Sequence, residues 1–359
     1  MDIKKLLERF SRVVSPSGYE YMAEPDMQKI INDGFQGVFD EVFFDKFGSC
    51  RLIKKAAPEI ENPKKIMLDA HIDQIGMVVT GILDGGFLRV KSLGGVDLNI
   101  LPASEFYVYT YGENDPFTFS ADKKIPAIAV SVPPHLKKTT GNNLPKLEDL
   151  YLDTGYDSKE ELEKIIKIGS PVTFKSDFLS LENNLVSCVG MDDRLCAAIL
   201  MLAIKSLKIT PEVEVHIVLS ASEETRALGA ETAAYEIQPD FAIVFDVDFS
   251  RDPGVDANSS IEINKGAGIT YSAMTNIHLT KKIIEFAKDK KIPVQINATP
   301  GGTGTNADII QITGEGVPCA VISIPLKNMH TFNEICSIKD VETIVELIRE
   351  IIENAKSLI

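Results

Sequence analysis

Acidic side chains and histidines recur at the downstream ends of short apolar segments in this 359-residue chain. They are His71 and Asp73 after 66–68, Glu223 and Glu224 after 213–219, Asp246 after 241–245, and His330 after 320–324. In an open α/β sheet, ligands bind beyond the carboxyl ends of the strands, so side chains far apart in the sequence can converge there. We therefore expect one site built from several strand ends.

In two of these motifs, neighbouring side chains could have different roles at a metal site. Residues two apart on an extended strand point the same way, so Asp73 could accept the ring N–H of His71 while the other ring nitrogen binds a metal. Consecutive glutamates point in different directions, so Glu224 could bind a metal while Glu223 reaches the metal-bound water as a general base. Taken alone, the His71-Ile72-Asp73 motif favours a surface or satisfied core histidine with an unrelated aspartate, because H-x-D often occurs by chance. The glutamate pair also fits a solvated acidic loop, although its position after a buried strand favours a functional role without deciding it.

A third motif, Asp192-Asp193-Arg194, stands at the head of an apolar segment with helical character. Acidic residues at a helix N-terminus usually cap the helix and complement its dipole. The alternative is that Asp192 gives one carboxylate oxygen to each of two metal ions. Two acids and an arginine exceed what one cap requires, and from the motif alone the two interpretations weigh about evenly.

Together these motifs supply two histidines and three carboxylates, a donor set that suits paired Zn²⁺, Co²⁺ or Mn²⁺ ions ~3.5–4 Å apart. The candidate metal ligands are His71, Asp192, Glu224, Asp246 and His330. Glu223 remains free to act as the base.

The elements that must position these residues alternate between strand and helix. Residues 1–36 indicate an amphipathic helical start interrupted by a turn at 15–18, and short apolar runs from 42 to 80 suit strands. Beyond 178, the pattern predicts helices over 193–207, 280–290 and 341–359. It predicts strands over 213–219, 241–245, 294–297 and 320–324. This alternation indicates an α/β fold, a three-layer α/β/α domain formed by residues 1–79 and 178–359.

The stretch 80–177 has a different texture, with short alternating apolar runs separated by glycine pairs, asparagine and Pro133-Pro134. Such a pattern predicts a small antiparallel β-rich insert. One helix is expected within it, over 158–168, capped by Ser158 and closed by Gly169.

Composition narrows the function classes. With 52 acidic and 37 basic residues the net charge is −15, which disfavours nucleic acid and anionic membranes as partners. The longest apolar run, 195–204, is far shorter than the ~20 residues of a membrane span, and Glu8 and Arg9 interrupt any signal-peptide core. Five scattered cysteines without a C-x-x-C pair favour a reducing cytoplasm over a disulfide framework or structural zinc site.

Further motifs follow one another through nearly the whole chain. They are Ser15-Pro16-Ser17-Gly18-Tyr19-Glu20, Ala70-His71-Ile72-Asp73, Pro133-Pro134-His135, Asp192-Asp193-Arg194, Glu223-Glu224 with Gly229-Ala230, Asp246 before Asp252-Pro253-Gly254, Gly301-Gly302-Thr303-Gly304, and Ile324-Pro325 with Met329-His330. In these motifs the chain resembles the tetrahedral dinuclear-metal aminopeptidases, metallopeptidase family forty-two. That family includes glutamyl and deblocking aminopeptidases and relatives labelled endoglucanases.

The resemblance implies a role for each candidate. One metal would be held by His71 and Asp246, the other by Glu224 and His330, with Asp192 bridging both and Glu223 as the base. It also implies a catalytic role for Asp73, a cis peptide bond between Asp192 and Asp193, and an insert that serves as a dimerisation domain. Twelve subunits, built from dimers, would form a hollow particle that admits only peptides.

The chain departs from the family pattern near the expected site. Gln74 stands in place of the glutamate of H-x-D-E-I-G, Asn306 in place of the aspartate of T-D-A, and Lys327-Asn328 in place of an Arg-Tyr pair. Ser222 and Thr225-Arg226 also differ from the usual Gln and Val-Gly. All the implied ligands are present, so these changes bear on substrate preference and efficiency more than on metal binding.

These observations predict a cytoplasmic metal-dependent aminopeptidase that acts on short peptides. A metal-bridged hydroxide would attack the first peptide carbonyl, with Glu223 removing the proton and delivering it to the leaving amine. A glycoside hydrolase is the enzymatic alternative, but it needs two carboxylates ~5–10 Å apart and no metal, and the absence of tryptophan weakens it. A catalytically degenerate homologue that binds peptides or assembles is the other alternative, motivated by Gln74, Asn306 and Lys327-Asn328.

Overall fold

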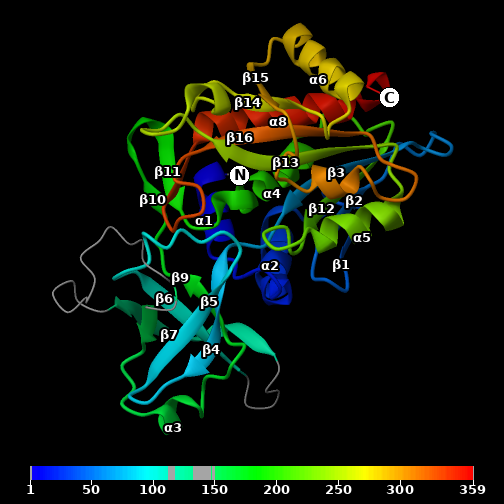
Figure 1. Cartoon of the computed structure of the whole chain (residues 1–359). Coiled ribbons are helices and arrows are strands. Elements are labelled where there is room, and N and C mark those ends of the chain that lie inside the picture. Colours follow the sequence, from blue (N-terminus) through cyan, green and yellow to red (C-terminus); the bar gives the residue numbers. More distant parts are fainter. Residues whose placement is uncertain (1, 112–117, 132–146, 148–149, 359) are drawn as a thin grey trace.

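The computed structural model describes residues 2–111, 118–131, 147 and 150–358. Within them, one mixed sheet of eight strands forms the centre of the larger part of the molecule (Figure 1). In spatial order its strands are β1 (Glu41–Phe44), β2 (Cys50–Lys54), β12 (Glu214–Ser220), β3 (Lys65–His71), β13 (Phe241–Phe249), β16 (Cys319–Leu326), β14 (Ala267–Ser272) and β15 (Val294–Thr299).

The four central strands of this sheet, β12, β3, β13 and β16, are parallel to one another. Their carboxyl ends therefore lie at the same edge, and register fixes the neighbours there: Ser220 pairs with His71, and Asp246 pairs with Ser323. Both faces of these strands are buried, which explains their nearly continuous apolar sequence.

Helices cover both faces of the sheet. Apolar side chains of one face pack against α1 (Ile3–Ser11), α2 (Glu24–Gly34), α4 (Met191–Lys205), α6 (Ile277–Asp289) and α8 (Ile338–Glu353). The opposite face packs against α5 (Leu228–Ile237) and the short α7 (Ala307–Ile310). The three-layer α/β/α architecture predicted from the sequence is confirmed.

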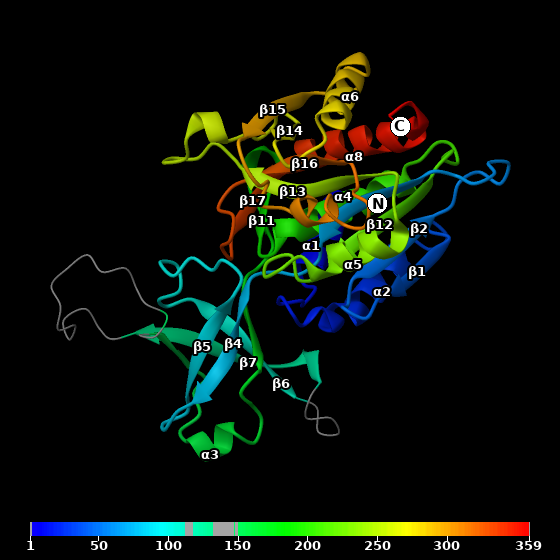
Figure 2. The same cartoon turned by 45° about the vertical axis from the view of Figure 1, so that its right-hand side comes forward.

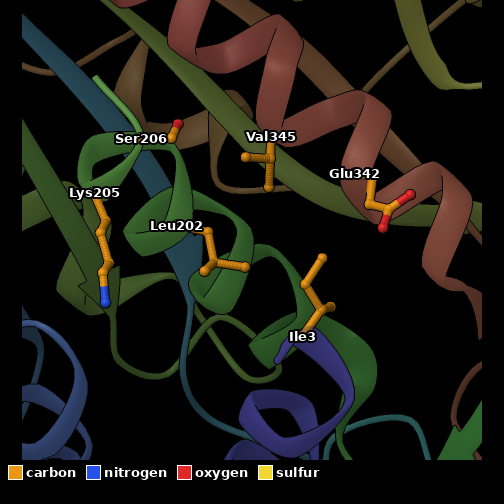
Figure 3. A pocket seen from close by; sticks show the side chains of 6 residues that line it. All are labelled: Ile3, Leu202, Lys205, Ser206, Glu342 and Val345. Carbon is orange, nitrogen blue, oxygen red and sulfur yellow. The ribbon is translucent and has the colours of Figure 1, made fainter. Parts of the chain in front are cut away.

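Helix α4 lies at the centre of the larger core. Nearly all of its residues are buried, because it packs against α1, α8 and β3 at once, and a helix that is apolar on all sides must be covered on all sides. Figure 3 shows Ile3, Leu202 and Val345 around a pocket where the far end of α4 meets α1 and α8. The N-terminal end of α4, which begins at Met191, carries Asp192 and Asp193.

The small β-rich part is a closed six-stranded barrel that hangs below the sheet in both views (Figures 1 and 2). In spatial order its strands are β4 (Gly76–Ile82), β5 (Phe87–Leu93), β8 (Leu150–Asp153), β7 (Phe119–Ser131), β6 (Glu105–Tyr111) and β9 (Pro171–Phe174). All its pairings are antiparallel, and it encloses its own apolar core. The antiparallel β unit predicted here is therefore present.

Some elements differ from the sequence predictions. The helix expected over 158–168 is only the single turn α3 (Lys159–Leu162), because the following residues form separate turns that carry Ile166 into the barrel core. Ser158 does cap it, accepting a hydrogen bond from the Glu161 N–H at 3.2 Å. The predictions lacked β14, α5 and a small sheet of β10 (Leu179–Ser180), β11 (Leu185–Cys188) and β17 (Glu334–Ser337). The Pro133-Pro134-His135 motif lies outside the described residues.

Across the described part of the chain, no helix combines the length and apolar character needed to cross a bilayer.

Gly229 provides a test of how α5 is seated on the sheet. An added Cβ would overlap the Ala221 backbone nitrogen and the Ser49 hydroxyl, so the start of α5 would have to move. We expect Gly229→Ala to lower the free energy of unfolding by about 1–3 kcal/mol, the usual cost of overpacking. Thermal unfolding at fixed protein concentration would show this as a lower midpoint. Gly81→Ala, whose Cβ would meet only Arg89 Cβ at an ordinary 3.6 Å, is the matched control, and an equal loss in both variants would contradict the explanation.

Candidate metal centre

The sequence-predicted residues meet at the carboxyl ends of the central strands. His71 is the last residue of β3, and Asp246 lies near the end of β13. Glu223 and Glu224 follow β12 in a tight turn, and His330 lies between β16 and β17. Parallel strand direction thus brings together residues separated by up to 259 positions in the sequence (330 − 71).

Asp192 lies at the centre of the cluster, facing both histidines. Its Oδ1 is 3.0 Å from His71 Nε2, and its Oδ2 is 3.2 Å from His330 Nε2. Each carboxylate oxygen therefore faces a different imidazole. This geometry distinguishes Asp192 from a helix cap, because its two carboxylate oxygens face the histidines at the strand ends.

The remaining carboxylates surround these three residues. Glu224 Oε2 lies 3.6 Å from His330 Nε2, and Glu223 Oε2 lies 3.8 Å from His71 Nε2. Ligand atoms of His71, Asp192 and Glu224 all lie within 4.8 Å of one another. The same holds for a second group, His71, Asp193 and Asp246. All seven residues singled out from the sequence are therefore in one place.

Asp193 was not among the candidate ligands, although it belongs to the motif. Its Oδ2 accepts a hydrogen bond from the His71 N–H at 3.1 Å, while its buried Oδ1 has no hydrogen-bond partner. The peptide bond between Asp192 and Asp193 is cis, as the resemblance implied.

Asp73 organises the turn that carries the glutamates. Its two carboxylate oxygens accept the backbone N–H groups of Glu223 at 3.0 Å and Glu224 at 3.2 Å. Because β3 ends at His71, Asp73 is no longer on the strand. The acceptor nearest to His71 Nδ1 is the Asp73 carbonyl oxygen at 3.0 Å, and the Asp73 carboxylate lies at 3.5 Å.

A second buried acid braces the same turn from the N-terminal region. Glu20 Oε1 accepts hydrogen bonds from the Ser222 N–H at 2.8 Å and the Ser222 hydroxyl at 3.0 Å. Ser222, directly before the glutamates, has a positive φ of 62°, which these bonds help to hold. Glu20 is the last residue of the Ser-Pro-Ser-Gly-Tyr-Glu motif, so this motif helps to hold the turn that carries the two glutamates.

Glu334 is a site residue that sequence reasoning missed. It is buried, and its two oxygens accept the backbone N–H groups of Asp192 at 3.1 Å and His330 at 3.0 Å. It therefore fixes two of the candidate ligands at once. Its position four residues after His330 was the available signal, but an isolated acid in a chain with 52 of them does not stand out.

The loop after β5 of the barrel also reaches the site. The carbonyl oxygen of Gly95 lies 2.9 Å from His330 Nδ1, which sets the orientation of the imidazole. A Cβ at Gly95 would lie 2.9 Å from His330 Nδ1, and one at Gly94 would lie 3.0 Å from Glu224 Oε2. Only glycine allows the barrel loop to approach these two side chains so closely.

The electrostatics of the site are dominated by the acidic side chains that are crowded into it. Burial and the Asp192 charge raise the pKa of Glu224 to about 8, and burial with the charges of Asp192 and Asp73 raises that of Glu223 to about 7. The hydrogen bond to Asp192 raises the pKa of His330 to about 9. Glu224 Oε1 is buried without a hydrogen-bond partner. A site with excess negative charge and spare oxygen acceptors is suited to hold cations.

Several solved structures that share this fold over nearly the whole chain are described as aminopeptidases or peptidases. The TET aminopeptidase of a marine-sediment thaumarchaeon is 28% identical, with a TM-score of 0.88 and 99% of each chain covered. The TET1 peptidase of Pyrococcus horikoshii, described as assembling into a tetrahedron or a large octahedral shell, is 27% identical with a TM-score of 0.82, over 98% of this chain and 100% of that one.

Sequence comparison makes the assignment specific. The lysyl aminopeptidase of Pyrococcus furiosus is 30% identical over 358 residues, which cover 99% of this chain and 98% of the relative. The model of the M42 glutamyl aminopeptidase family matches residues 50–347. The chain belongs to this family.

Glu334 provides a test of the site that does not depend on catalysis. In Glu334→Gln, the side-chain NH₂ would face one of the two backbone N–H donors, so Asp192 or His330 would lose its support. We expect Zn²⁺ affinity to fall about 10- to 100-fold, as for other losses of groups that orient ligands. Competition with a chromophoric chelator would measure it. Glu342→Gln on the exposed side of α8 should bind as the unmodified protein does, and unchanged affinity in Glu334→Gln would refute the role.

Proposed function

We propose that this protein is a metal-dependent aminopeptidase that removes N-terminal residues from short peptides. The observation that carries the proposal is the Asp192 carboxylate, whose two oxygens face the two histidines separately. An arrangement with a histidine on each side of one carboxylate suits a pair of cations bridged by that carboxylate. Family membership supports the aminopeptidase activity.

The residues present fit two divalent cations per chain. We assign His71 and Asp246 to one ion, Glu224 and His330 to the other, and Asp192 to both. The unpartnered buried oxygen Glu224 Oε1 supports this assignment, because a buried acceptor without a donor is otherwise costly. Nitrogen and oxygen donors of this kind suit Zn²⁺ or Co²⁺, and also Mn²⁺.

When bound, such cations supply Lewis acidity to the peptide carbonyl and lower the pKa of the attacking water. Glu223 is the general base that takes the proton from this water and passes it to the leaving amine. Its carboxylate reaches to within 3.8 Å of His71 Nε2, which places it at the edge of the candidate metal centre. Asp73 holds the Glu223 and Glu224 backbone in place.

Assembly forms part of the same proposal. We propose a catalytic domain of residues 1–79 and 178–359, and an insert of residues 80–177 that joins subunits into dimers. Twelve subunits would then enclose the sites, in a cytoplasmic particle that acts on peptides. The solved structures described as a dodecamer and as a tetrahedron support this assembly by similarity.

The activities named for two relatives differ in the N-terminal residue that is removed. One relative is a lysyl aminopeptidase, whereas a glutamyl aminopeptidase from Lactococcus lactis is 23% identical over 95% of this chain. Side chains of opposite charge are thus removed by members of one family. The preference of this chain for one N-terminal residue must therefore follow from the side chains of its own substrate-binding pocket.

The general base can be tested by an isosteric change. Glu223→Gln keeps the size and the hydrogen-bonding reach of the side chain but cannot accept the proton, so kcat should fall by about 10²- to 10⁴-fold with metal content unchanged. Amino-acid release from a short peptide, alongside metal analysis, would measure both. Glu231→Gln on the exposed side of α5 is the control. Full activity in Glu223→Gln would rule out the assignment.

A glycoside hydrolase is the second candidate, because a similar solved structure at 28% identity is described as a putative peptidase/endoglucanase. Chelation separates the two functions. Removing metals should abolish peptide hydrolysis, and Zn²⁺, Co²⁺ or Mn²⁺ should restore it, whereas a two-carboxylate glycosidase needs no metal. Chelator-insensitive cleavage of a β-glucan would favour the glycosidase. Retention of two metals without release of any amino acid would favour a binding protein.

A further inference from the structure

A pocket of about 270 Å³ lies at the end of β13 that carries Asp246, and its lining includes Asp248, two residues further along this strand. Strands β13 to β16 form its floor, and the loop 299–305 that follows β15 forms one wall. Its lining residues include Asp248 and Asn297, together with Thr270, Thr303 and Ser323. A pocket of this size accommodates one extended amino-acid side chain.

The pocket adjoins the reacting centre through β13. Asp246 and Asp248 are two residues apart on this strand, so their side chains project from the same face, roughly 7 Å apart along it. Asp246 itself groups with His71 and Asp193. The side chain of a substrate's first residue branches one atom from the carbonyl that is attacked. A side chain that extends from the metal centre along β13 would therefore reach this pocket.

Asp248 is a carboxylate in the pocket without a cation. Its Oδ2 accepts a hydrogen bond from Asn297 Nδ2 at 2.9 Å, and its Oδ1 accepts the N–H of Phe249 at 2.7 Å. Both donors are neutral, and among the described residues it forms no ion pair. A largely buried carboxylate with only neutral partners is poorly compensated, and it favours a ligand that brings a positive charge.

The surrounding side chains leave this carboxylate available. Among the described residues that line the pocket there is no lysine, arginine or histidine. The nearby cations are already paired, Lys327 with Asp252 at 2.6 Å and Arg251 with Glu262 at 3.0 Å. Asp308 is committed to the loop wall, where it accepts hydrogen bonds from the Thr303 N–H and hydroxyl.

We propose that this pocket receives the side chain of the substrate's N-terminal residue and that Asp248 makes it selective for a cationic side chain, lysine or arginine. The assignment rests on the proposed aminopeptidase function. A glutamyl side chain would meet like charge, and an uncharged norleucyl chain of nearly the same length would leave Asp248 unpaired. The hydroxyl groups of the pocket would solvate the remaining ammonium or guanidinium hydrogens.

The test compares kcat/KM for lysyl, arginyl, norleucyl, glutamyl and glutaminyl 4-nitroanilides with the metal-loaded enzyme. We expect lysyl to exceed norleucyl substrates by about 10- to 100-fold, the usual strength of a hydrogen-bonded charge pair. In Asp248→Asn this ratio should fall towards one. The ratio is the readout because partial loss of metal or of folded protein lowers both rates together. Asp289→Asn, which removes a charge from the exposed end of α6, should keep the original ratio.

A charge-reversed variant extends the test. In Asp248→Lys, glutamyl substrates should be cleaved faster than glutaminyl ones, the opposite of the unmodified enzyme. An enzyme that cleaves norleucyl as well as lysyl substrates, or a preference that survives in Asp248→Asn, overturns the pocket assignment but not the aminopeptidase. If no peptide or anilide is cleaved with any of the three metals, the proposed function fails and the assignment fails with it.

Discussion

Repulsion among buried carboxylates is the constraint on which the rest of this structure depends. Asp192, Glu223, Glu224 and Asp246 are gathered where four parallel strands end, and the Asp192 charge raises the pKa of the other three. The chain offsets part of this cost with two imidazoles. Bracing acids such as Asp73 and Glu334 take up backbone N–H donors and hold the cluster rigid, but they add negative charge of their own. Bound cations would neutralise the negative charge that remains.

Two departures from the family pattern place neutral amides at buried positions near the site. Asn306 is buried beneath the strand ends and donates to the Asp69 carboxylate at 2.6 Å and to the Ser220 hydroxyl at 2.8 Å. An aspartate there would face Asp69, whose pKa burial already raises to about 7. Gln74 accepts a hydrogen bond from the buried Arg194. Neither side chain lines the pocket beside Asp246, so any influence on substrate preference passes through the cluster and not through direct contact.

The sequence predicted which side chains meet at the site, but not which residues hold those side chains in place. Residues after buried strands can be recognised because strand direction alone brings them to one edge, and this placed His71, Asp246 and the glutamates together. Gly95 acts on His330 from a segment 235 residues away, and no local pattern reports such a contact; Glu334 is only four residues from His330, but nothing in its local sequence sets it apart from the other acids. Strand β14 was missed because it runs antiparallel to β16 after a long connection, outside the strand–helix alternation that guided the prediction.

The glycine pair after β5 has a consequence for how this molecule can change over time. Gly94 and Gly95 belong to the chain segment that forms the barrel, yet they touch Glu224 and His330 of the other part. The barrel is therefore not a freely exchangeable module. A recombinant that exchanged this segment with that of a distant relative would inherit a working centre only if the incoming loop also lacked side chains at both positions. We therefore expect the barrel and the larger part to evolve together, because a side chain at position 94 or 95 would collide with Glu224 or His330.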